Sequence, residues 1–120
     1  MGATEFTTIG HGSTVSKAFK NAVEDALYDW GHGGYTGTIA EKDSFIVIED
    51  TPEQILQEME DRDRNKYTKL LTSKSPNARA SYMAEALFEI DDERIMSKWG
   101  PAGAIYVEDD IWLFFGYAST

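Results

Sequence analysis

Ile111-Trp112-Leu113-Phe114-Phe115-Gly116-Tyr117-Ala118 decides the fold, because this stretch is apolar on both sides of an extended chain. Successive side chains of a β-strand point to opposite faces. A strand with two apolar faces is buried on both sides or forms an interface. We predict a central strand, with a partner or homodimer contact through Trp112 and Phe114 as the alternative, since aromatic anchors dominate interfaces.

Four further stretches have the β-branched and aromatic composition of strands. They span residues 5–9, 35–41, 44–49 and 104–107. The first is predicted to be an edge strand. Lys42-Asp43 and Glu108-Asp109-Asp110 are polar connections between neighbouring runs, and each predicts a hairpin.

Apolar residues at helical spacing predict the helices, and a capping residue precedes each first turn. The apolar pattern that follows Thr51 lapses across residues 60–66. This leaves open either one helix that is solvated in its middle or two shorter helices. The predicted helix starts are Ser13 or Thr14, Thr51-Pro52, Ser75-Pro76 and Asp91, and the predicted ends include Gly31 and Gly100-Pro101.

These elements predict one α+β domain over residues 1–120, in the order β-α-β-β-α-α-β-β. Because the strands come in adjacent pairs with short connections, we expect a mainly antiparallel sheet of about five strands. The amphipathic helices are expected to pack on one face of it.

The chain is strongly acidic, with 21 Asp and Glu against 11 Lys and Arg and a net charge of −10. This charge argues against direct binding of nucleic acid or of a membrane surface. The absence of cysteine excludes disulfides, thiolate metal sites and a cysteine nucleophile. Since we find neither a span of about 18 apolar residues nor a signal peptide, we expect a cytoplasmic protein. We expect no cofactor.

The segment from Gly31 to Thr38 holds four glycines and one of the two histidines. Such a segment can bring backbone close to a ligand, but here it follows a helix, whose negative end repels phosphate, and it has no Walker lysine. A structural turn is the preferred interpretation, and a nucleotide or cyclic-dinucleotide site is the alternative. The candidate ligand-binding residues are His11, His32, Gly33, Gly34, Tyr35, Thr36 and Thr38.

The two histidines each lie between glycines, which leaves the imidazole uncrowded and able to approach a ligand or metal. However, a helix of about seventeen residues would hold them roughly 25 Å apart, so we predict neither a shared metal site nor a catalytic pair. His11-Gly12-Ser13 is similar to the start of some ADP-ribosyltransferases. No acidic residue can be assigned as their catalytic glutamate, so no catalytic residue is predicted.

Acidic residues gather in clusters, of which Glu49-Asp50 is the first. Capping and helix dipoles explain each cluster alone. Together on one face, the carboxylates could imitate DNA and occupy a basic groove of a nuclease or another nucleic-acid enzyme. Beside the aromatic pair above, the candidate partner-binding residues are Glu58, Glu60, Asp61, Asp63, Asp91, Asp92, Glu93, Glu108, Asp109 and Asp110.

Three strings of residues carry a resemblance to small proteins encoded by tailed phages and prophages. They are residues 28–40 (YDWGHGGYTGTIA), residues 98–103 (KWGPAG) and residues 114–118 (FFGYA). No activity is assigned to that group, so the resemblance implies a setting and no site: an accessory protein in the cytoplasm of an infected bacterium. We therefore expect a non-enzymatic protein that blocks a host or defence protein with a basic surface. The alternatives are a nucleotide sponge or small enzyme that uses the glycine-rich segment, and a virion component.

Overall fold

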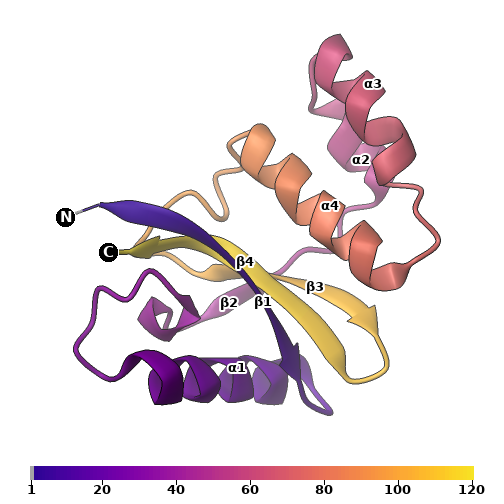
Figure 1. The fold of residues 1–120 in the computed structure, drawn as a ribbon. Helices are drawn as coiled ribbons and strands as arrows, with labels where there is room; N and C mark the ends of the chain where they lie inside the picture. The colour runs from indigo at the N-terminus through magenta and orange to yellow at the C-terminus, as the bar shows by residue number, and fades with distance from the viewer. Residues whose placement is uncertain (1) are drawn as a thin grey trace.

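The computed structural model describes residues 2–120 as one four-stranded sheet with helices on both faces (Figure 1). The strands lie in the order β1-β4-β3-β2, and only the β2–β3 pair is parallel. The α+β class is confirmed, whereas the sheet is mixed and smaller than predicted. The elements are β1 (Ala3–His11), α1 (Val15–Trp30), the 3-10 turn η1 (Ile39–Glu41), β2 (Phe45–Val47), α2 (Pro52–Gln57), α3 (Asp61–Leu70), α4 (Pro76–Glu89), β3 (Ala102–Glu108) and β4 (Ile111–Ser119).

β4 is the central strand, as its two apolar faces predict. It pairs antiparallel with β1 on one side and with β3 on the other. Leu113 and Phe115 enter one core cluster, and Phe114 enters the other. Phe114 has no exposed surface and its ring packs against Phe19 and Phe45, so its predicted role in partner binding is wrong for the folded chain. Trp112 is only half-buried.

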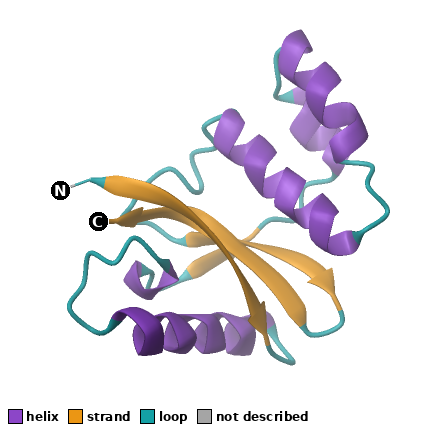
Figure 2. Cartoon of the chain, in the orientation of Figure 1, coloured by secondary structure: helices purple, strands orange, loops and turns teal. Residues whose placement is uncertain are grey.

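The helices form two layers, one on each face of the sheet (Figures 1 and 2). α1 and η1 cover one face, where Ala18 and Ala22 are buried. α4 covers the other face with Ala84 and Leu87, and α2 and α3 pack beside it. The prediction of a single helical layer is therefore wrong. The physical reason is β4 itself, because each of its apolar faces must be removed from water.

Residues 35–41 do not form the predicted strand. Tyr35 has φ 57° and Gly37 has φ 71°, and both angles interrupt an extended chain. The hydroxyl of Thr38 accepts a hydrogen bond from the Ala40 amide and caps η1. The β-branched residues of this segment favour a strand, but hydrogen bonds from the backbone to threonine side chains stabilise a turn instead.

Lys42 is buried, although the sequence suggested a polar hairpin connection at this position. Its ammonium donates hydrogen bonds to the carbonyls of Ser97, Lys98 and Gly100 at 3.1, 3.3 and 2.9 Å. The chain then enters β2, which runs parallel to β3 after a crossover through α2, α3 and α4. A parallel pair needs such a long connection. The hairpin predicted across Lys42-Asp43 is wrong, because residues 35–41 form no strand and β2 pairs with β3 instead.

The predicted start and end signals occur in the structure, except those of the helix predicted from Asp91 to Gly100-Pro101, which does not form. Thr14 caps α1, Gly31 ends it with φ 82°, and Thr51 forms a complete capping box with Gln54. The open question after Thr51 is settled in favour of two helices, α2 and α3. Asp91 has φ 52° and is followed by turns instead of a helix.

Candidate functional site

The glycine-rich loop is organised around the carboxylate of Glu41. Its oxygens accept hydrogen bonds from the amides of Tyr35 and Thr36 at 3.0 and 3.1 Å. The Thr36 hydroxyl donates to the same carboxylate at 2.8 Å, and the Ser119 hydroxyl lies 3.4 Å from it. Partial burial raises the pKa of Glu41, but the hydrogen bonds from Thr36 and Tyr35 outweigh this effect and hold the pKa below its usual value.

These contacts occupy three donors that an anionic ligand could use, namely the amides of Tyr35 and Thr36 and the Thr36 hydroxyl. The Thr38 hydroxyl is also engaged, because it shares a 2.8 Å hydrogen bond with the Thr36 hydroxyl. His32 and Tyr35 remain exposed, with 56% of Tyr35 accessible. Gly34 has φ 78°, a turn conformation that glycine adopts without strain. The loop therefore has the geometry of the preferred structural turn, with an internal carboxylate where a phosphate would sit.

The two histidines are not brought together. His11 ends β1 and His32 follows α1, so the length of that helix separates them (Figure 1). A Cβ on Gly10 would lie 2.5 Å from the Ala18 carbonyl oxygen, and one on Gly12 would lie 2.4 Å from the Ala18 amide nitrogen. The Gly-His-Gly sequence thus permits close packing of α1 on β1. Within residues 2–120, no group of three or more His, Asp or Glu side chains is arranged to hold a metal ion.

Residues of three of the four predicted acidic clusters meet in one surface hollow, between the end of α4 and the α2–α3 connection. Its two parts enclose about 490 and 290 Å³ and share Glu58, Ile90 and Asp91. We call this surface the acidic hollow. Asp61 belongs to the same predicted cluster but does not line the hollow. The acidic residues that line it are Asp50, Glu58, Glu60, Asp63, Glu89, Asp91, Asp92 and Glu93.

Arg94 is the cation of the acidic hollow. Its guanidinium bonds both oxygens of Asp50 at 3.0 and 2.9 Å and both oxygens of Asp92 at 2.9 and 2.8 Å. Hydrogen bonds from Arg94 lower the pKa of Asp50 and of Asp92. The other ion pair within residues 2–120 joins Arg64 to Asp61. The remaining carboxylates of the hollow are thus left without a cationic partner in the described chain.

The fourth predicted cluster, Glu108-Asp109-Asp110, lies elsewhere. It forms the β3–β4 turn, which Figure 1 places far from the end of α4. Asp109 has φ 47°, and the Asp110 carbonyl accepts a hydrogen bond from the Gly12 amide. These contacts are those of a structural turn, so the structure brings residues of three acidic clusters together and leaves the fourth apart.

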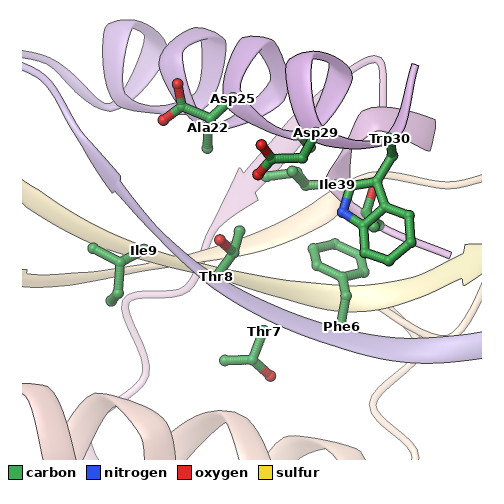
Figure 3. A pocket seen from close by; sticks show the side chains of 11 residues that line it. Phe6, Thr7, Thr8, Ile9, Ala22, Asp25, Asp29, Trp30 and Ile39 are labelled. Carbon is green, nitrogen blue, oxygen red and sulfur yellow. The ribbon is translucent and has the colours of Figure 1, made fainter. Parts of the chain in front are cut away.

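A second hollow, of about 240 Å³, lies between β1 and α1 and was not predicted. Residues 6–9 line it from the strand, and Asp25, Asp29 and Trp30 line it from α1 (Figure 3). Trp30 is 64% exposed. We call this hollow the β1 groove. The sequence carried part of the signal, because Asp25 and Asp29 lie one helical turn apart on one side of a predicted helix, but it did not place that helix beside the predicted edge strand.

Comparison with protein-family models, curated proteins and solved structures gives no match for this chain. No helix in residues 2–120 combines the length and the apolar character that a membrane crossing requires.

Proposed function

We propose that this protein acts by binding and not by catalysis, and that its acidic hollow occupies a basic surface of a partner protein. The observation that carries the proposal is the meeting of residues 58–63 and 89–93 in one concave surface. These segments are distant in the sequence, so capping of individual helices does not account for their convergence.

The charge balance of the hollow supports a cationic partner. Glu58, Glu60, Asp91 and Glu93 are exposed, and Arg94 is already held by Asp50 and Asp92. An unneutralised acidic surface attracts basic partners, speeds their association and makes it sensitive to salt. It also repels nucleic acid and a second copy of the same surface.

The setting follows from the resemblance to small proteins of tailed phages and prophages. In that setting, the partner is a host or defence protein of an infected bacterium, and the bound acidic chain acts as its inhibitor. Enzymes that handle nucleic acids fit this description, because their grooves are basic.

The competing function, a nucleotide or cyclic-dinucleotide site in the glycine-rich loop, receives less support. The Tyr35 and Thr36 amides and the Thr36 hydroxyl, which could hold a phosphate, already bind Glu41. We expect nucleotides and cyclic dinucleotides to leave the melting temperature unchanged. A stabilisation that disappears in Tyr35→Ala would instead favour the competing function.

The test of the proposal compares two matched double variants of the full chain. E58Q/D91N removes two charges from the hollow, and E108Q/D109N removes two charges from the distant turn. Asp91 and Asp109 have φ 52° and 47°, a conformation that asparagine tolerates, so the two pairs carry similar risks to folding. A partner is captured from phage-infected cells and purified, and its Kd is measured at low and high salt.

We expect tighter binding at low salt, a loss of about two- to tenfold in affinity for E58Q/D91N, and no change for E108Q/D109N. Equal losses in both variants would mean that total charge and not the hollow governs binding. A partner whose affinity is independent of salt would also contradict the proposal.

A further inference from the structure

β1 offers an open row of backbone hydrogen-bonding groups on its outer side. Gly2 and Thr120 exchange two hydrogen bonds, and the Gly12 amide donates to the Asp110 carbonyl. Since hydrogen-bonded and non-hydrogen-bonded pairs alternate along an antiparallel ladder, the even-numbered residues of β1 bond to β4. The amides and carbonyls of Glu5, Thr7 and Ile9 therefore point away from the sheet.

This edge lacks the usual protection against further pairing. β1 has nine residues in continuous register with β4, from Ala3 to His11, and contains neither proline nor lysine. Proteins commonly shield an edge with a bulge, a proline, a lysine or a covering segment. Among the outward-pointing backbone groups of β1, the His11 carbonyl accepts a hydrogen bond from the Asn21 side chain.

The β1 groove runs along this edge. The four consecutive residues 6–9 line it, although their side chains alternate between the two faces of the sheet, so the groove follows the strand's edge. Asp25 and Asp29 line it from α1, and Trp30 borders it (Figure 3). An added strand would place every second side chain beside these two carboxylates.

The charges of the groove select the occupant. In an antiparallel β1–β1 dimer, the two copies of α1 would lie side by side on one face of the joined sheet. Asp25 and Asp29 of one copy would then face the same acidic residues of the other, and like charges oppose this pairing. Lysine or arginine at alternate positions of a different chain would meet them with opposite charge.

We propose that β1 receives an extended basic segment of a partner protein as a fifth strand of the sheet. The backbone groups of Glu5, Thr7 and Ile9 supply the hydrogen bonds, as in other cases of strand addition. Asp25 and Asp29 select basic side chains on the α1 side of the added strand. This site is separate from the acidic hollow, and the inference does not depend on the function proposed for that hollow.

The probe for this site is a blocked octapeptide of alternating lysine and threonine, and a glutamate–threonine octapeptide is the control. Binding to the full-length chain is followed by NMR as chemical-shift changes and slowed hydrogen exchange of individual amides. Three variants complete the design. T7P removes the outward Thr7 amide, D25N/D29N removes the groove charges, and E108Q/D109N removes two charges from the distant turn.

We expect the basic peptide to slow exchange of the Thr7 and Ile9 amides, and the acidic peptide to have no effect. T7P should fold, because Thr7 lies opposite Phe115 in a non-hydrogen-bonded pair, and it should lose peptide binding. D25N/D29N should weaken binding by about threefold or more, whereas E108Q/D109N should leave it unchanged. If T7P does not fold, the D25N/D29N result decides the question.

Three results would overturn the inference. The first is shift changes confined to the acidic hollow with none in β1. The second is equal weakening by D25N/D29N and E108Q/D109N. The third is dimerisation of the free chain through β1, which would make a second copy the occupant. None of these results measures the affinity of the captured partner for E58Q/D91N, so this inference and the proposed function can fail independently.

Discussion

Glu41→Gln tests whether one carboxylate organises the glycine-rich loop. Glutamine keeps the shape of the side chain but replaces one oxygen with an NH2 group. That group cannot accept the hydrogen bonds that Thr36 donates to Glu41 through its amide and hydroxyl at 3.1 and 2.8 Å. If the side-chain amide turned its NH2 group toward Tyr35 instead, the Tyr35 amide would lose its acceptor, so either orientation leaves a backbone amide unpaired and removes the charged acceptor.

The expected loss of unfolding free energy is about 1–2 kcal/mol. A hydrogen bond to a charged group contributes about 1.5–3 kcal/mol and a neutral one about 1 kcal/mol, and water at this half-exposed loop compensates part of the difference. A loss of this size corresponds to a drop of roughly 4–8 °C in Tm for a chain of this length.

The loss should depend on pH, because folding lowers the pKa of Glu41 from its usual value of 4.5. A carboxylate with a lowered pKa contributes stability above that usual value and loses the contribution as the pH falls through its folded value. The difference between wild type and E41Q should therefore be complete near pH 7 and smaller near pH 3.

Equilibrium urea unfolding at both pH values measures this difference, with Glu24→Gln on the exposed face of α1 as the control. A difference at neutral pH that matches the Glu24→Gln control would refute the role of the carboxylate. A difference of the same size at both pH values would refute its ionic character.

Three further predictions concern packing and charge. Lys42→Met leaves three backbone carbonyls without their donor and should lower the unfolding free energy by about 2–4 kcal/mol in urea titrations; a loss under about 1 kcal/mol would contradict this. Gly10→Ala should cost about 1–3 kcal/mol, because its Cβ would meet α1 backbone at 2.5 Å, and an unchanged Tm would argue against this contact. Arg94→Met should cost about 1–2 kcal/mol near pH 7. This loss of unfolding free energy should shrink at pH values below 3.8, the usual pKa of aspartate, because Asp50 and Asp92 lose their contribution as the pH falls through their lowered folded pKa values. A difference in unfolding free energy between wild type and Arg94→Met that stays the same across this pH range would contradict the prediction.

Signals that act over a few residues predicted the corresponding elements. The capping box at Thr51, the Ser75-Pro76 start and Gly31 at the end of α1 are local arrangements. Ion pairs between segments that are distant in the sequence are not local signals. Asp91 could have capped a helix by its residue type, but the chain adopts φ 52° there and turns toward Arg94 and the acidic hollow.

For the candidate sites, the sequence predicted some of the residues that take part but not which of them lie together, because contacts between distant segments form only in the folded chain. The acidic clusters are visible in the sequence, but their convergence depends on the way in which α4 packs beside α2 and α3. The glycine-rich segment is equally visible, and only the folded chain reveals that Glu41 fills it. The β1 groove was missed because an edge becomes a site only when a particular helix lies beside it.

The sequence by itself determined the central strand, the starts of α1, α2 and α4, the end of α1 and the α+β class, since apolar periodicity and caps act within one element. Only the tertiary structure decided which segments contact one another. It paired β2 parallel with β3, buried Lys42 beneath residues 97–100 and placed α1 over β1. These features depend on groups tens of residues apart, and their energies exist only once the chain brings those groups into contact.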